Sequence, residues 1–281
     1  MAPESGDVAV SEEALLESSD AIFIGCPHTR YRSLPLQRHP LLFDCWGFAR
    51  PPELQIAKAE AEAQKFLKVA VVGGAGHVGL PLSLALAQCG HVVTILDKDS
   101  KRLESIKAGK FPFLEAGGAA LLQHCLDRCS DRLLFSTSVS AIRECDVVVV
   151  TIGTPVDEHL NPCFPVIQDC VNELKPFLRN GQTLLLRSTV FPGTSSRVLA
   201  DLPLGVGVSF CPERIAQGKA VEELRSLPQL ISGSDQRALV HAQALFSPLK
   251  VDLITLELQE AEAAKLFLNA WRYVAFGTAN Q

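Results

Sequence analysis

Short apolar runs alternate with amphipathic stretches between residues 67 and 254. The apolar runs are of strand length, and the stretches between most of them are helical in pattern. Alternation of this kind, with continuously apolar strands, predicts an α/β fold built on a doubly wound parallel sheet. The expected strands are 67–72, 91–96, 132–136, 147–151, 183–187 and 206–210, and the clearest helices are 80–88 and 99–108.

Residues 255–281 have a different pattern, with no proline and a single glycine. They predict one long helix with a narrow polar face at helical spacing. The polar face consists of Glu262, Lys265, Asn269, Arg272 and Asn280. Because the flanking positions are apolar, we expect a buried helix whose polar stripe faces a cleft or a charged partner. The alternative is a solvated stripe on a surface helix.

The chain before this region reads as a separate piece. Residues 11–18 predict a helix, and 21–25 and 41–44 predict strands, ahead of a Pro-Pro pair at 51 and 52 that marks a boundary. Residues 57–64 form a polar helix or linker. The chain therefore divides into segments 1–50, 51–66, 67–254 and 255–281.

Composition narrows the class of protein. The 281 residues are 47% hydrophobic and carry a formal net charge of −5, which gives no basic surface for nucleic acid or anionic membrane. The acidic N-terminus does not resemble a secretory signal, and no apolar run is long enough to span a bilayer. Nine cysteines show no second ligand pair for zinc, so we expect no metal site and reduced, buried thiols in a cytoplasmic protein.

A glycine-rich motif follows the first strand of the sheet. Gly74, Gly76 and Gly79 form a GxGxxG pattern that includes His77 and Val78 and opens a helix. Gly74 permits a tight turn, Gly76 a close approach to a pyrophosphate, and Gly79 close helix packing. The N–H groups of the helix start favour the phosphates, with His77 contributing its backbone.

An acidic residue follows at the spacing that this motif requires. Asp97 ends the next strand, eighteen positions after Gly79, where it is placed to accept hydrogen bonds from an adenosine ribose. A carboxylate there repels a 2′-phosphate, so the sequence predicts a Rossmann domain that binds NAD rather than NADP. A glycine turn that binds another ligand is the alternative.

Five further stretches occur in series, and together they resemble one family. They are Gly153-Thr154-Pro155, Ser188-Thr189-Val190 with Pro192-Gly193-Thr194, Cys211-Pro212-Glu213-Arg214, Gly218-Lys219, and residues 262–269. In this order they resemble the UDP-glucose/GDP-mannose dehydrogenase family over residues 68–281. The PER…GK form is most similar to the branch that oxidises UDP-N-acetylhexosamines such as UDP-N-acetylmannosamine.

The resemblance implies an activity and roles for particular residues. Members of the family oxidise the C6 alcohol of a nucleotide sugar to a carboxylate with two NAD molecules, through a cysteine thioester. By resemblance Arg102 adds a contact near the adenosine, and Thr154 and Thr189 face the dinucleotide. Glu213 is implicated in hydrolysis near the reacting carbon. Lys265 and Asn269 stabilise the oxyanion and orient water, a role that suits donors four apart on a helix. Lys265 could instead pair with Glu262, and Glu213 could cap a helix.

The family's cysteine lies in a GGxC segment after the central helix, and no such segment occurs in these 281 residues. Cys211 matches a variable position and is a poor substitute. Residues 19–47 resemble the end of the family's UDP-binding domain, which normally follows the helix. A slice of a tandem or permuted enzyme, or a disrupted reading frame, would each produce this order.

Three functions therefore remain open. The first is NAD-dependent oxidation of a UDP-sugar, with a homodimer formed through the central helix. The second is an NAD-binding module without turnover, because covalent catalysis needs a positioned thiolate. The third is a structural pseudoenzyme whose central helix serves dimerisation.

Overall fold

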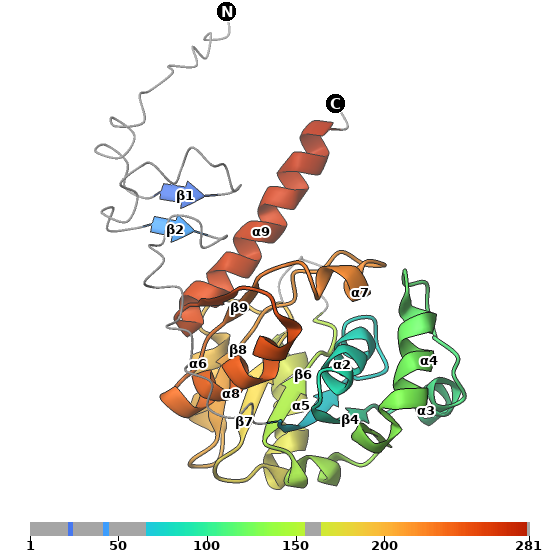
Figure 1. The fold of residues 1–281 in the computed structure, drawn as a ribbon. Helices are drawn as coiled ribbons and strands as arrows, with labels where there is room; N and C mark the ends of the chain where they lie inside the picture. The colour runs from blue at the N-terminus through green and yellow to red at the C-terminus, as the bar shows by residue number, and fades with distance from the viewer. Residues whose placement is uncertain (1–21, 25–41, 45–65, 155–163, 280–281) are drawn as a thin grey trace, which may run out of the picture. The chain divides into compact units, whose positions relative to one another are not determined.

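The computed structural model describes residues 22–24, 42–44, 66–154 and 164–279 (Figure 1). These residues fall into two compact units. The larger unit, Ile56–Leu266, carries the main sheet, and the smaller comprises Met1–Gln55 and Phe267–Gln281. The larger unit therefore includes the first part of the long helix, which the sequence pattern assigned to a separate segment from residue 255.

The main sheet has six parallel strands in the order β5-β4-β3-β6-β7-β8. This order confirms the predicted doubly wound sheet, because the strand order reverses direction beside the first strand of the domain. Each expected strand is present within two residues of its predicted bounds. The strands are β3 (Lys68–Val72), β4 (Val92–Leu96), β5 (Leu133–Ser136), β6 (Val147–Val150), β7 (Thr183–Leu186) and β8 (Gly207–Phe210).

Helices cover both faces of the sheet, and each face has its own core. Val69 and Val71 of β3 belong to one core, and Ala70 belongs to the other, because successive side chains of a strand point to opposite faces. The first core contains side chains of α2 (Gly79–Gln88), α3 (Ser100–Lys107), α4 (Gly118–Arg128) and α8 (Gln236–Phe246). The second contains side chains of α5 (Phe164–Leu174), α6 (Thr194–Asp201) and α9 (Leu258–Ala279).

A small second sheet completes the larger unit. Strands β9 (Gln229–Ile231) and β10 (Leu253–Thr255) form a parallel pair. The serines that follow β9 bind the backbone of β8: Ser232 Oγ donates to Phe210 O at 2.7 Å, and the N–H of Val208 donates to Ser234 Oγ at 2.9 Å. The short helix α7 (Ala220–Glu223) lies between β8 and β9 in sequence.

The long helix α9 is only partly buried. Glu262 is 0% exposed and Lys265 8%, but Trp271 is 47% and Phe276 67% exposed. The expectation of a helix buried throughout is therefore wrong for its last turns. Apolar composition shows that a helix face avoids water, but it does not show whether the covering surface lies in the same chain. No helix among the described residues is long and apolar enough to cross a membrane.

In the smaller unit, β1 (Ile22–Ile24) and β2 (Leu42–Asp44) match the two predicted strands and pair with each other in parallel. The predicted helix at 11–18 and the helix or linker at 57–64 lie outside the described residues.

Candidate functional site

The candidate site lies along the carboxyl ends of the parallel strands, which all meet at one edge of the sheet. In open sheets of this type a ligand binds in the crevice where the strand order reverses. Here that point lies between β3 and β6. The segments that follow β3, β4, β6, β7 and β8 carry Gly73–Gly79, Asp97, Thr151–Thr154, Ser188–Thr189 and Cys211–Glu213.

The turn after β3 requires glycine, because a side chain at either of two positions would overlap neighbouring backbone atoms. A Cβ on Gly79 would lie 2.4 Å from the carbonyl oxygen of Gly73 and 2.7 Å from the Cα of Gly74. A Cβ on Gly74 would lie 2.6 Å from the carbonyl oxygen of Val71. Gly73 has φ +76, a conformation that L side chains rarely adopt. The positive φ thus belongs to Gly73, whereas Gly74 and Gly79 are needed for close packing.

Helix α2 begins at this turn and presents its N-terminus to the crevice edge. Its N-cap residue, Val78, makes no side-chain capping bond, and its first turn contains no acidic residue. The N–H of Leu80 already donates to Gly76 O at 3.0 Å and Pro81 has no N–H, so the N–H groups of Val78 and Gly79 are the ones that favour an anion. The exposed His77 ring stacks on Phe113 with centroids 3.9 Å apart, so the imidazole supports the turn from outside. Gly76 turns the chain through a bond from its N–H to Gly73 O at 3.0 Å.

Asp97 links the end of β4 to the glycine turn. Its Oδ2 accepts the N–H of Ala75 at 3.0 Å, and its Oδ1 accepts the N–H of Asp99 at 3.1 Å. Each oxygen keeps a further acceptor position for a ribose hydroxyl. Arg102 lies in the first turn of α3, with its Nε 3.6 Å from the Asp99 carboxylate. Asp97 is therefore where the sequence placed it, and it also holds the turn.

Threonine and serine side chains connect the ends of β3, β6 and β7. Thr151 Oγ1 donates to Val72 O at 2.8 Å, and Thr154 Oγ1 donates to Thr189 O at 2.8 Å. Ser188 Oγ donates to Ile152 O at 2.6 Å. The structure thus joins Thr154 and Thr189 by a hydrogen bond, a contact that the sequence did not predict. Thr151 also lies beside Gly79, whose added Cβ would come within 2.8 Å of its hydroxyl.

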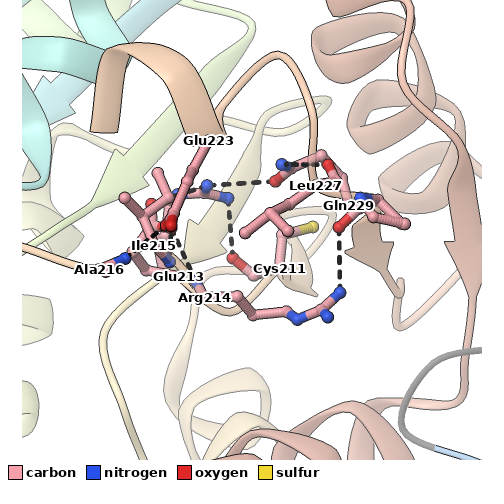
Figure 2. Close-up of polar contacts among 10 residues, drawn as sticks. Cys211, Glu213, Arg214, Ile215, Ala216, Glu223, Leu227 and Gln229 are labelled. Carbon is pink, nitrogen blue, oxygen red and sulfur yellow. Dashed lines mark hydrogen bonds and ion pairs between the residues drawn. The ribbon is translucent and has the colours of Figure 1, made fainter. Parts of the chain in front are cut away.

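A buried ion pair organises the loop after β8 (Figure 2). Arg187 is fully buried, and its Nε and Nη2 lie 2.8 and 2.7 Å from Glu213 Oε2. The same guanidinium donates to Cys211 O at 3.2 Å and to Gln229 Oε1 at 3.1 Å, and it lies 5.1 Å from the centroid of the Phe246 ring. The arginine thereby joins the end of β7, the loop after β8 and the start of β9.

The other oxygen of Glu213 is also occupied. Oε1 accepts the N–H groups of Arg214 and Ile215 at 2.7 and 2.9 Å, as Figure 2 shows. A carboxylate offers about four acceptor positions, and all are used here. Glu213 can act on a substrate only if one of these bonds opens. It caps the turn at 214–215, not a helix.

Cys211 is not suited to be a nucleophile in this arrangement. It is 0% exposed, and burial raises the pKa of its thiol, with Ser209 as a hydrogen-bonding neighbour at 3.3 Å. The thiolate is the reactive form, so a buried protonated thiol is inert. All six described cysteines are free and buried or half-buried. Burial raises the pKa of Cys125 to about 12 and of Cys170 to about 11.

Lys265 and Asn269 are the two residues of α9 that were expected to stabilise the oxyanion. Lys265 is buried, with 8% of its surface exposed, whereas Asn269, four positions later, is exposed. Glu262, one turn before Lys265, accepts the N–H groups of Gly193 and Ser195. From the sequence, an ion pair with Lys265 was the only contact predicted for Glu262, and these backbone contacts were not predicted.

The sequence interpretation also missed three residues of the strand edge: Gly73, Thr151 and Arg187. A signal existed for Arg187, because a charged residue directly after a fully apolar strand needs a partner. No sequence signal identified Glu213 as that partner.

The comparison with known families agrees with this geometry. Residues 67–250 match the model of the UDP-glucose/GDP-mannose dehydrogenase family, NAD binding domain. The chain belongs to this family. The matched part is its NAD-binding domain, so the cofactor of the crevice is NAD, and the glycine turn, the open N-terminus of α2 and Asp97 fit it.

Two curated relatives and one solved structure show the extent of the similarity. The chain is 28% identical over 232 residues to UDP-N-acetyl-D-mannosamine dehydrogenase of Methanococcus aeolicus, covering 80% of this chain and 52% of that protein. It is 30% identical over 222 residues to GDP-mannose 6-dehydrogenase of Pseudomonas putida, covering 74% and 50%. A GDP-mannose dehydrogenase ternary complex from Pseudomonas aeruginosa superposes with TM-score 0.70 at 26% identity, covering 76% and 51%. The chain spans about half the length of these relatives.

Proposed function

We propose that this chain is the cofactor half of an NAD-dependent UDP-sugar 6-dehydrogenase, acting on the C6 alcohol of a UDP-N-acetylhexosamine. The observation that carries the proposal is the arrangement at the crevice between β3 and β6, where the glycine turn, Asp97 and the Thr154–Thr189 pair share one edge. NAD bound in this crevice would supply the hydride acceptor for oxidation at C6. We assign a UDP-N-acetylhexosamine as the substrate from the PER…GK pattern. Because one relative is named GDP-mannose 6-dehydrogenase, GDP-sugars must be tested beside UDP-sugars.

In this proposal the residues of the chain have separate tasks. The N–H groups at the start of α2 bind the pyrophosphate, and Asp97 binds the adenosine ribose. Lys265 and Asn269 donate to the developing negative charge on the C6 oxygen. Glu213, held by Arg187 in the loop after β8, would face the reacting carbon and assist hydrolysis when one of its bonds opens.

The competing proposal is an NAD-binding module that does not turn over. Its support is that Cys211, two positions before Glu213, is fully buried and that burial raises the pKa of its thiol. Under this proposal, the thiolate comes from another polypeptide segment.

The deciding experiment has two steps. NADH binding to the purified chain is measured first by fluorescence, and NADH formation is then followed with NAD and a panel of UDP- and GDP-sugars. Sustained formation with one UDP-N-acetylhexosamine supports the dehydrogenase, and binding without formation supports the module. Absence of NADH binding by a folded chain contradicts both.

Two substitutions localise the cofactor within this experiment. Asp97→Ala should weaken NADH binding by about tenfold or more, because a charged hydrogen-bond acceptor is lost, and should narrow the preference for NADH over NADPH. Asp97→Asn is the control that keeps an acceptor for Ala75 without the charge. Lys265→Ala should leave NADH binding nearly unchanged, and a large loss would place Lys265 in the cofactor site or in the core.

A homodimer through α9 and a cytoplasmic location are part of the same proposal. The exposed apolar side chains of α9 support the dimer: Trp271, Tyr273, Val274 and Phe276. Sedimentation should show a dimer without NAD, and a monomer at micromolar concentration would contradict it.

A further inference from the structure

Glu262 is a fully buried glutamate whose carboxylate bridges two backbone amides. Its Oε2 accepts the N–H of Gly193 at 2.6 Å, and its Oε1 accepts the N–H of Ser195 at 2.7 Å. The side chain is 0% exposed, although it belongs to α9 and the amides belong to the start of α6. A charge buried to this extent is retained only where its bonds compensate for lost hydration. The contact is therefore a strong tie between two elements that lie 67 to 69 positions apart in sequence.

The start of α6 needs this tie because its own N-cap residue cannot supply one. The N-cap position is Gly193, with φ 89 and no side-chain capping bond. Serine, threonine, aspartate or asparagine ordinarily accepts the N–H of the first turn from this position. Glu262 takes over this role from another helix, and its negative charge is favourable at a helix N-terminus.

The tie lies next to two residues of the candidate site. The loop that it holds follows β7 and contains Thr189, and Lys265 follows Glu262 by one turn of α9. A doubly wound sheet has two mononucleotide-binding halves. Asp97, directly after β4, assigns the adenosine to the β3–β4 side, so the nicotinamide half lies on the side of β6, β7 and β8.

We propose that Glu262 is a positioning residue, which fixes the loop after β7 and the Lys265 turn of α9 in one arrangement on the nicotinamide side of the crevice. The inference rests on the proposed NAD site. It assigns Glu262 no contact with substrate or cofactor. Its effect passes through the loop that contains Thr189, which Thr154 also binds through its hydroxyl.

The test compares two ligands that share the adenosine half. Kd values for NADH and for ADP-ribose, which lacks the nicotinamide, are measured for the whole chain and for Glu262→Gln. The glutamine keeps the size of the side chain but sets an NH2 group against one N–H donor. We expect NADH affinity to fall about tenfold, because one buried bond is lost, and ADP-ribose affinity to stay within about twofold.

Controls separate positioning from general loss of stability. Glu257→Gln makes the same chemical change at an exposed position just before α9 and should alter neither Kd. Equal losses for both ligands, or no loss for either, would overturn the proposal. If the unsubstituted chain binds neither NADH nor ADP-ribose, the result contradicts the NAD site itself.

A measurement on the unsubstituted chain keeps the proposal testable if Glu262→Gln does not fold. Residue-resolved hydrogen exchange should show the Gly193 and Ser195 amides protected, because both are bound to a buried carboxylate. Rapid exchange at both amides would overturn the proposal, whereas protection supports it.

Discussion

The two halves of the strand edge are built by different means. At the ends of β3 and β4, the tight turn depends on glycines that have no side chain, since an added Cβ on Gly74 or Gly79 would overlap backbone atoms. At the ends of β7 and β8, the shape comes from buried charges, namely the Arg187–Glu213 pair and Glu262 of α9, which binds the start of α6. The first half depends on steric contacts within one short turn of the chain. The second depends on contacts of charged side chains with residues that are far away in sequence. Substitutions should therefore damage the two halves in different ways.

The largest expected effect is on the charged half. Arg187→Met should lower the free energy of unfolding by about 3–5 kcal/mol, because it leaves the mostly buried Glu213 carboxylate without its partner. Urea denaturation measures the change. The double variant Arg187→Met/Glu213→Gln should recover part of the loss, because no uncompensated charge remains. A double variant less stable than Arg187→Met would show that the pair is not coupled in this way.

A smaller effect is expected on the glycine half. Gly79→Ala should lower the free energy of unfolding by about 1–3 kcal/mol, the range for an overpacked site, because the added Cβ would overlap the Gly73 carbonyl. NADH affinity should fall together with stability, since the same turn forms the pyrophosphate site. Gly277→Ala on α9 is the matched control, because its Cβ meets nothing within 4 Å. It should leave NADH binding unchanged, and an equal loss of affinity in both variants would argue against the steric explanation.

The smallest effect concerns the pH dependence of stability and the buried His91, which lies directly before β4. Burial lowers the pKa of His91 below 6.5, with partial compensation by the Leu245 carbonyl, and its Nδ1 accepts the N–H of Leu67 at 3.1 Å. As pH falls below 6.5, the unfolded chain binds a proton that the folded chain does not, so stability decreases. The slope from this one group is at most about 1.4 kcal/mol per pH unit.

Urea denaturation between pH 7 and pH 5 tests this. His91→Gln should flatten the pH dependence, whereas His124→Gln, at an exposed position, serves as the control for removal of a histidine. An unchanged slope in His91→Gln would show that other groups dominate.

The same contrast explains what the sequence could predict. The six strands and the GxGxxG turn were predicted correctly, because period, apolar runs and glycine sterics are local properties. Asp97 was found through a fixed spacing to the turn. The pairing of Arg187 with Glu213 spans 26 positions, and that of Glu262 with Gly193 spans 69. Each of these side chains has several chemically acceptable partners, and only the folded backbone selects one.

The long helix illustrates a second reason for error. Its apolar residues were expected to be buried because they resemble a core. The structure buries Ala261 and Ala264 but leaves Trp271, Val274 and Phe276 exposed. Hydrophobic pattern reports a preference for burial and carries no information on which surface provides it.

The position of β3 in the sheet has a consequence for synthesis on the ribosome. Within the larger unit, β3 emerges first, and it occupies the centre of the sheet, between β4 and β6. β4 and then β5 add to one edge, after which β6, β7 and β8 add in turn to the other. Each emerging strand thus meets an edge that is already present, and no gap must be held open for a strand still to be translated. The order of translation therefore permits assembly of the sheet from β3 outward in both directions.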